Sequence, residues 1–291
     1  MEYPTRNHPS SFHQQTIVYP VISRRSRGIS IGINVSPTKR CTFGCVYCQI
    51  HVDRTKNAKE LALLSPTIDL GQLRRELLAT VDSAVSGRLF EEKRFGATRS
   101  DYRRLNDFAF SGDGEPTLAP QFPEVVDILR SIRRELALPQ VKLILITNST
   151  TLREERTIAG CDALTAENGE IWAKLDGGTE ADYREMNRSE VPFSTILENL
   201  RFASRRWPVK LQTMLLRLGG RAPDNRWIDC YCAAVREILG AGGTFRSIQL
   251  YTVARPPAHG CCTPLDDGEM DAYAAKIAEE TSLPTEVFYS K

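Results

Sequence analysis

The stretch that decides the fold is a predicted strand followed by three cysteines: Ile29-Ser30-Ile31-Gly32-Ile33-Asn34-Val35, then Cys41-Thr42-Phe43-Gly44-Cys45-Val46-Tyr47-Cys48. Apolar side chains at every second position from 29 to 35 predict a strand with small residues on its second face. Three thiols within eight residues, spaced C-x3-C-x2-C, can converge on one soft metal centre. The stretch therefore predicts a strand that leads directly into a metal-binding loop.

Strand and helix patterns alternate along the rest of the chain. Apolar runs predict strands at 107–110, 141–146, 170–175, 209–215, 245–251 and 285–289, and helical spacing predicts helices at 69–86, 122–136, 152–164, 194–205, 227–239 and 269–280. This alternation is typical of an α/β fold, in which helical crossovers join parallel strands. Periodicity alone fits both a barrel and a doubly wound open sheet.

Glycine and polar residues follow several of the predicted strands. In parallel α/β barrels the chemistry gathers at the carboxyl ends of the strands. Those ends carry the cysteine loop, the run Gly112-Asp113-Gly114-Glu115-Pro116, Asn148, Asp176 and the residues after Tyr251. Glycines there let the backbone approach a ligand closely, and a carboxylate such as Glu115 can accept hydrogen bonds from an ammonium group. The pattern predicts one site beside the cysteines.

Composition limits the class of protein and its partners. The chain has 291 residues, of which 41% are hydrophobic and 25% charged, and a formal net charge of +2. This small charge gives no argument for nucleic acid as a partner. No apolar run approaches the length that crosses a bilayer, and the polar segment 1–15 lacks a signal-peptide core. We therefore expect a cytoplasmic protein without membrane contact, in which eight cysteines favour metal binding over disulfides.

Several segments together resemble one protein family. They are residues 19–25, residues 32–34 with the cysteine loop, residues 110–117, residues 174–176, residues 212–214 and residues 253–257. The combination resembles the branch of the radical SAM superfamily that is related to the wyosine (tRNA) synthases. This resemblance implies a partial (β/α)6 TIM-type barrel at 29–258. It also implies a short irregular N-terminal arm at 1–28 and a C-terminal extension at 259–291, packed on the barrel.

The resemblance also implies cofactors and a reaction. Cys41, Cys45 and Cys48 would hold a [4Fe–4S] cluster whose open iron binds S-adenosylmethionine (SAM), and one electron would cleave SAM to a 5′-deoxyadenosyl radical. The radical would abstract hydrogen from a small molecule, a peptide or RNA, and a flavodoxin or ferredoxin would be the reductant. The cofactor contacts that the resemblance implies are Tyr47, Gly112, Asp113, Gly114, Glu115, Asn148, Lys174, Asp176 and Gln212.

Two positions differ from the patterns of this superfamily. Asp113 stands between two glycines where the general motif is Gly-Gly-Glu, a variant that fits the wyosine-related branch. The wyosine synthases carry a second cluster on cysteines upstream of the SAM motif, and no cysteine precedes Cys41 here. We therefore do not expect the chemistry of wyosine formation, or tRNA as the substrate, from the resemblance.

Other interpretations of the cysteines stay open. His51 completes a C-x3-C-x2-C-x2-H spacing that suits zinc in a nucleic-acid-binding module. An iron–sulfur protein that carries electrons without cleaving SAM is a third interpretation. Cys261 and Cys262 could hold a second cluster, but no further C-x2-C spacing favours this over unligated thiols. The basic run at 23–27 is interpreted as a solvated turn.

Overall fold

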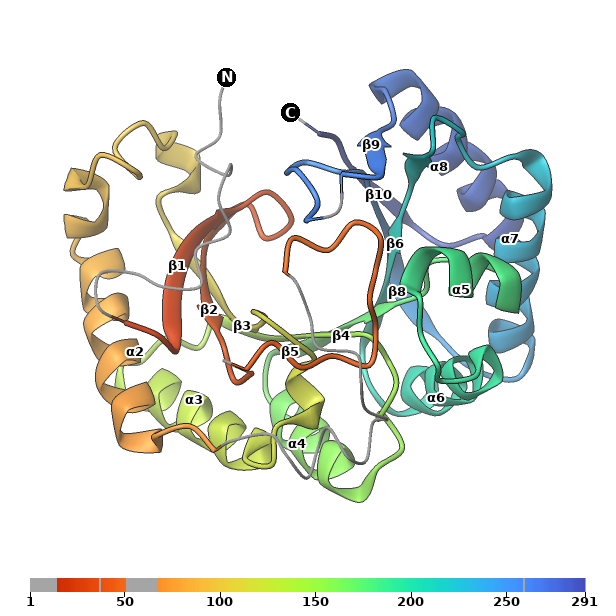
Figure 1. Ribbon diagram of the computed structural model, residues 1–291. Helices are drawn as coiled ribbons and strands as arrows, with labels where there is room; N and C mark the ends of the chain where they lie inside the picture. Colours follow the sequence, from red (N-terminus) through yellow and green to blue (C-terminus); the bar gives the residue numbers. More distant parts are fainter. Residues whose placement is uncertain (1–14, 37, 51–66, 259, 291) are drawn as a thin grey trace.

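The computed structural model describes residues 15–36, 38–50, 67–258 and 260–290. Its main feature is an eight-stranded sheet with the order β1-β2-β3-β4-β5-β6-β8-β10. The sheet curls into an incomplete barrel with the helices outside it (Figure 1). Because the strand order never reverses, successive right-handed crossovers place their helices on one face. The predicted partial TIM-type barrel is confirmed, and the doubly wound alternative is wrong.

The parallel strands follow the prediction to within a few residues. β1 runs antiparallel to β2, and every later pair of neighbours in the sheet is parallel. The strands are β1 (Val18–Ser23), β2 (Gly28–Ile33), β3 (Leu105–Phe110), β4 (Lys142–Thr147), β5 (Gly169–Lys174), β6 (Val209–Met214), β8 (Phe245–Tyr251) and β10 (Thr285–Phe288). A separate antiparallel pair consists of β7 (Leu216–Leu218) and β9 (Cys262–Pro264).

The helices cover the outer face of the sheet, and two of them begin at aspartate caps, of which Asp69 was expected from the sequence. Asp69 accepts a hydrogen bond from the Gln72 amide, and Asp266 forms a capping box with Glu269. The helices are α2 (Leu70–Val85), α3 (Phe122–Glu135), α4 (Glu155–Thr165), α5 (Glu180–Asn187), α6 (Phe193–Arg206), α7 (Asn225–Gly240) and α8 (Asp267–Thr281), and the short 3-10 turns are η1 (Arg88–Glu91), η2 (Ser100–Tyr102) and η3 (Pro116–Leu118). Among the described residues, no helix is both long and apolar enough to span a bilayer.

The predicted irregular arm contributes an edge strand instead. β1 pairs with β2 over its whole length, and Pro20 lies opposite Ile31. A proline is tolerated there because an edge strand has one row of backbone groups outside the ladder. The buried carboxylate of Glu76 in α2 accepts the amides of Ile17 at 3.0 Å and Val18 at 2.9 Å. This contact fixes the start of β1 against the barrel.

The two edges of the sheet, β1 and β10, approach one another through the turn between β1 and β2. Within this turn Arg24 donates a hydrogen bond to the backbone carbonyl of Tyr289, just beyond β10. The turn between β1 and β2 lies near the middle of the open side of the barrel (Figure 1). The C-terminal extension is thereby in contact with the N-terminal hairpin as well as with β8.

The inner face of the sheet has charged residues near the amino ends of the strands. Glu170 on β5 pairs with Lys142 on β4 and lies 3.8 Å from Lys210 on β6, which in turn lies 3.2 Å from Glu286 on β10. The Trp172 indole donates to Glu170 at 3.1 Å. Above these charges the inner face is apolar, with a small cluster of Ala109, Ile144, Ile146 and Trp172. The floor of the barrel is therefore a network of ion pairs that joins four strands.

We expect Glu170→Gln to destabilise the fold in a pH-dependent way. Burial raises the pKa of Glu170, but bonds from Lys142 and Trp172 and the charge of Lys210 outweigh it and lower that pKa below its usual value. A lowered carboxyl pKa stabilises the fold above the unfolded-state value, about 4.3, and this contribution is lost as pH falls through the folded-state pKa. Chemical denaturation at pH 7 should show a loss of about 2 kcal/mol, shrinking below pH 4.

Glu237→Gln is the matched control for this prediction. Glu237 also forms an ion pair, with Arg201, but its side chain is 60% exposed. Exposed ion pairs contribute little, so the change in unfolding free energy should stay below about 0.5 kcal/mol. Equal effects of the two substitutions at pH 7 would show that the network in the barrel does not stabilise the fold.

Candidate active site at the strand ends

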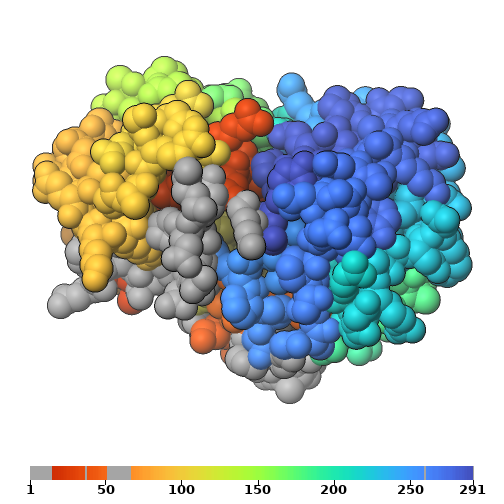
Figure 2. Space-filling view, turned by 90° about the horizontal axis from the view of Figure 1, so that it is seen from above, coloured from red at the N-terminus to blue at the C-terminus, as the bar shows by residue number. Residues whose placement is uncertain are grey.

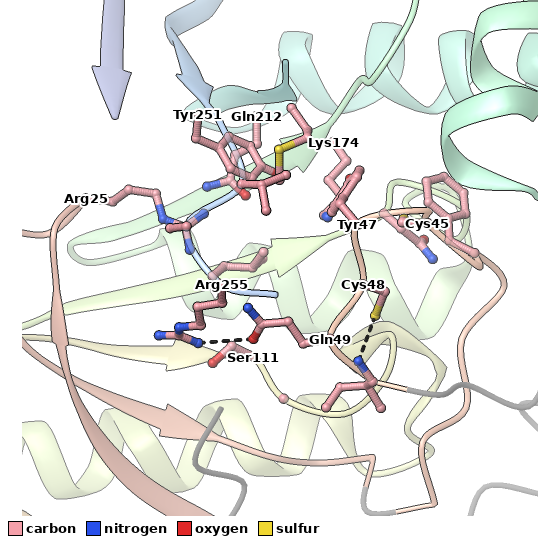
Figure 3. Close-up of a pocket in the computed structure, with 18 of the residues that line it drawn as sticks. Arg25, Cys45, Tyr47, Cys48, Gln49, Ser111, Lys174, Gln212, Tyr251 and Arg255 are labelled. Atoms are coloured by element: carbon pink, nitrogen blue, oxygen red, sulfur yellow. Dashed lines mark hydrogen bonds between the residues drawn. The ribbon is translucent and has the colours of Figure 1, made fainter. Parts of the chain in front are cut away.

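A cavity of about 360 Å³ opens at the carboxyl ends of the strands (Figure 3). Its walls come from the cysteine loop, the loop after β3, the ends of β4, β5 and β6, and the segment after β8. Of the predicted site residues, Asp176 does not line the cavity. The eleven that do are Cys41, Cys45, Tyr47, Cys48, Gly112, Asp113, Gly114, Glu115, Asn148, Lys174 and Gln212. Residues 21–25 and Phe288 also line it, so segments far apart in the sequence meet at one place.

All three cysteine sulfurs of the loop accept N–H hydrogen bonds. Backbone amides donate to Cys41 from Phe43 and to Cys48 from Ile50, each at 3.4 Å. The Asn187 side chain donates to the Cys45 sulfur at 3.3 Å. Such donors stabilise thiolates and are typical of sulfurs that ligate a metal cluster. Among the described residues, no three His, Cys, Asp or Glu side chains are grouped for a single metal ion.

Burial favours the neutral form of the Cys41 and Cys45 thiols. Desolvation is the largest contribution that raises the pKa of Cys41, followed by the charges of Glu115 and Cys45. Desolvation likewise raises the pKa of Cys45, against the opposing charge of Lys174. A cationic centre bound by the sulfurs would supply the compensation that thiolates need in this setting. The donor set therefore fits a cluster that carries positive charge on its irons.

The cysteine loop is fixed by the end of α5. Gly44 and Val46 donate their amides to the carbonyls of Asn187 and Met186, at 2.8 and 2.9 Å. The Asn187 side chain is fully buried and contacts both Cys45 and Asp176. Sequence reasoning missed this residue because an asparagine at a helix end is usually a cap. Only its distance from the cysteines in space shows its role.

Two glycines after β3 allow the backbone to lie against the cysteine loop. Gly112 has a φ of +143°, and a side chain there would approach the Asn34 amide oxygen to 2.7 Å. At Gly114 a side chain would come within 2.1 Å of the Arg40 carbonyl oxygen. Asp113, between them, accepts from the Asn34 side chain at 3.1 Å through Oδ2. Its Oδ1 is buried without a partner among the described residues, so an acceptor remains free at the cavity wall.

Glu115 is held by four donors at the ends of β3 and β4. Its Oε1 accepts from the Thr117 amide and hydroxyl and from the Thr147 hydroxyl, and its Oε2 accepts from the Asn148 amide at 2.7 Å. Burial raises the pKa of Glu115, and these bonds oppose that rise. The carboxylate is therefore fixed in position beside the cavity, with one acceptor site of Oε2 unused by these bonds.

The side chain of Asn148 supports the loop. Its Nδ2 donates to the Thr42 hydroxyl at 2.7 Å and lies 3.5 Å from the Cys41 sulfur. Its Oδ1 accepts from the Thr150 hydroxyl at 2.7 Å. Asn148 thus connects the end of β4 with the first cysteine. Because its side-chain amide already forms these hydrogen bonds, it has little capacity to bind a ligand.

Tyr47, Lys174 and Asp176 form one buried group. The Tyr47 hydroxyl donates to Asp176, and the Lys174 ammonium donates to the Tyr47 hydroxyl at 3.0 Å while lying 4.7 Å from the centre of its ring. Asp176 also accepts from the Met214 amide at 2.9 Å and from Asn187 at 2.8 Å. Desolvation lowers the pKa of Lys174, but the charges of Tyr251, Cys45 and Asp176 outweigh it and raise the pKa well above its usual value. The group places a cation beside the thiols.

Gln212 forms a side-chain pair with Gln249 on the neighbouring strand. The Gln212 Nε2 donates to the Gln249 Oε1 at 2.8 Å, and both side chains are fully buried. A single hydrogen bond between two side-chain amides uses one amino group and one carbonyl oxygen, so the other amino group and the other carbonyl oxygen remain without a partner in the pair. Accordingly Gln212 Oε1 and Gln249 Nε2 have no partner among the described residues.

The remaining cysteines do not join the loop in one group. Cys161 is buried in α4, and Cys230 and Cys232 lie in α7 with only Cys232 buried. The sulfurs of Cys261 and Cys262 each lie 3.7 Å from the Val46 carbonyl, so these two thiols pack behind the cysteine loop. His51, the fourth ligand of the zinc interpretation, lies outside the described residues.

Three arginines that the prediction did not include as site residues also line the cavity: Arg24, Arg25 and Arg255. The guanidinium of Arg25 lies 5.6 Å from the ring centre of Trp172 and 5.5 Å from that of Tyr251. The interpretation of residues 23–27 as a solvated turn is therefore wrong for Arg25, although Arg27 is exposed. Arg255, after β8, donates to the Gln49 side chain at 3.3 Å (Figure 3).

Comparison with known proteins finds relatives of low sequence identity. A UPF0026 protein from Methanocaldococcus jannaschii is 29% identical over 190 residues, covering 64% of this chain and 49% of that protein. A UPF0026 protein from Synechocystis sp. is 25% identical over 218 residues, covering 73% of this chain and 69% of that protein. The chain therefore spans about half the length of the first of these relatives. No protein-family model matches it.

Solved structures share the fold. TYW1, determined with a lysine–pyruvate adduct bound, superimposes with a TM-score of 0.51 at 17% identity and covers 88% of this chain and 74% of its own. SuiB from Streptococcus suis, determined with S-adenosylmethionine bound, gives a TM-score of 0.53 at 9% identity, covering 91% and 52%. Both are radical SAM enzymes, and TYW1 is the wyosine synthase. The resemblance to this superfamily is confirmed at the level of the fold: the chain has the partial barrel of the radical SAM core.

Proposed function

We propose that the protein is a radical SAM enzyme, in which Cys41, Cys45 and Cys48 hold a [4Fe–4S] cluster and SAM binds in the cavity. The observation that carries the proposal is that three cysteines of one loop line a single cavity at the strand ends of the barrel, and that the sulfur of each accepts an N–H hydrogen bond. S-adenosylmethionine bound to SuiB, which shares the fold, supports the choice of ligand.

The acceptors on the cavity wall suit the ammonium group of SAM. Among the described residues, Asp113 Oδ1 lacks a partner, and Glu115 Oε2 accepts a single hydrogen bond, from the Asn148 amide. Burial raises the pKa of both carboxyls, and a cation beside them would offset this cost. We assign the ammonium group to these two residues, with Gly112 and Gly114 allowing the close approach.

Other residues of the chain position the loop and keep water out. A bound cluster supplies the single electron that cleaves SAM. Asn148 and Asn187 orient Cys41 and Cys45 through their side-chain amides. Ile146, Met214 and Phe288 give the cavity an apolar wall, which limits the access of water to a reactive radical.

The partners and compartment follow from the same chemistry. A flavodoxin or ferredoxin would supply the electron, and the substrate is a small molecule, a peptide or RNA. All eight cysteines are free thiols, which suits the reducing environment of the cytoplasm. We therefore keep the cytoplasm as the proposed location.

We expect the anaerobically reconstituted protein, given dithionite and SAM, to contain iron and sulfide and to release 5′-deoxyadenosine. Cys45→Ala should abolish both the cluster and the product, because it removes one of three ligands. Cys230→Ala is the matched control, since this thiol lies in α7 and should leave both unchanged. Iron analysis and chromatography of the products measure the two outcomes.

Two results would replace the proposal. Zinc in place of iron would favour the zinc-containing nucleic-acid-binding module. A full cluster that never yields 5′-deoxyadenosine, and whose reduced EPR signal SAM does not alter, would favour the iron–sulfur electron carrier.

We expect Asn187→Ala to weaken retention of the cluster. The substitution removes the amide that donates to Cys45 and to Asp176, and loss of such supporting contacts typically costs metal sites about 10-fold or more in affinity. Loss of iron to a chelator should accelerate about 10-fold. Asn225→Ala, at an exposed position in α7, should match the wild type. Equal rates in the two variants would show that Asn187 does not support the cluster.

A further inference from the structure

Two arginines enter the cavity from parts of the chain far apart in sequence. Arg25 lies in the turn between β1 and β2, and Arg255 lies in the segment after β8. Both line the cavity, and both side chains extend into the space between the cysteine loop and the open side of the barrel (Figure 3). In a space-filling view, residues of the C-terminal part lie beside the N-terminal hairpin on this face (Figure 2).

The guanidinium of Arg25 forms cation–π contacts with two rings. It lies over the rings of Trp172 and Tyr251, at 5.6 and 5.5 Å from their centres. Such contacts do not use the N–H donors of a guanidinium in hydrogen bonds, so these donors remain available for bidentate acceptors. Arg25 forms no ion pair within the described parts of the chain. The charge of the Asp107 carboxylate acts on Arg25 without forming an ion pair with it; Asp107 Oδ1 accepts from Ser30, and its Oδ2 has no partner among the described residues.

Arg255 likewise forms no ion pair among the described residues. Its contact is with the neutral amide of Gln49. Desolvation and the neighbouring charges of Arg25, Arg24 and Arg94 lower the pKa of Arg255, so like charges gather around it. Guanidinium groups in a partly buried cavity are costly unless an anion is present.

Arg133 shows how this protein satisfies a buried arginine that has a structural role. Arg133 in α3 has a side chain only 4% exposed, and it donates to the Val141 carbonyl at 3.1 Å and pairs with Glu167. Its charge is therefore satisfied by the fold. Arg25 and Arg255 have no such acidic partner and face a cavity instead, which indicates that their partner is a ligand.

We propose that Arg25 and Arg255 bind an oxyanion, a carboxylate or a phosphate, of the substrate. This inference rests on the proposed radical SAM function, because it places the anion in the cavity that SAM also enters. Gln212, whose buried Oε1 lacks a partner within the described residues, provides an acceptor on the same wall. The substrate class is thus an anionic polar molecule whose charged end is held by a pair of guanidiniums.

The test is calorimetric titration of the reconstituted protein at low ionic strength, with saturating SAM. The two probes are inorganic phosphate and malonate, which separate a phosphate from a carboxylate group. The wild type should bind at least one of them. Arg25→Gln and Arg255→Gln should each weaken that binding about 10-fold or more, because each removes charge-assisted hydrogen bonds. Arg25→Lys should also weaken it, since an ammonium lacks the bidentate edge.

Arg27→Gln is the matched control, because Arg27 lies in the same turn but is exposed. Its affinity for the probe should stay within twofold of the wild type. The inference is overturned if neither anion binds, if the Arg25 and Arg255 variants bind as the Arg27 variant does, or if SAM and the anion displace one another. The last result would assign the arginines to the carboxylate of SAM itself.

The titration experiment and the SAM-cleavage experiment can fail independently of one another. A protein that releases 5′-deoxyadenosine but binds neither anion overturns this inference and leaves the proposed function in place. A protein that holds a full cluster and never cleaves SAM overturns the proposed function, and the substrate assignment with it.

Discussion

The buried carboxylate of Asp176 is the contact on which the site depends. It accepts hydrogen bonds from the Tyr47 hydroxyl, the Asn187 side chain and the Met214 amide, which belong to the cysteine loop, to α5 and to the end of β6. A buried carboxylate is costly unless such donors surround it, so these segments must assemble together. Asp176 does not itself line the cavity. It acts by fixing the residues that do, and through Asn187 it reaches the sulfur of Cys45.

The order and type of the parallel strands could be predicted from the sequence because each has its own apolar pattern and a helix between it and the next. The choice between barrel and open sheet could not, because it depends on strand order in space. The edge strand β1 was predicted as part of an irregular arm since Pro20 disfavours a central strand. It forms because Glu76, 58 residues beyond Val18, supplies an acceptor for its first amides. No local pattern contains that partner.

The location of the site could also be predicted, because parallel strands bring their carboxyl ends to one edge. The roles of single residues could not. Asn148 follows its strand as expected, but its side chain contacts Thr42 and Cys41. Asn187 and Arg25 were missed because one lies at a helix end and the other in a basic turn, where neutral interpretations are usual. Their partners, Cys45 for one and the rings of Trp172 and Tyr251 for the other, come from distant segments.

The turn between β1 and β2 joins the two edges of the sheet. Arg24 bonds to the Tyr289 carbonyl beyond β10, while the adjacent Arg25 lies inside the barrel. The residue that joins the two edges of the sheet and the residue that faces the cavity are therefore neighbours in one turn, so the position of Arg25 depends on the contact that Arg24 makes beyond the end of β10.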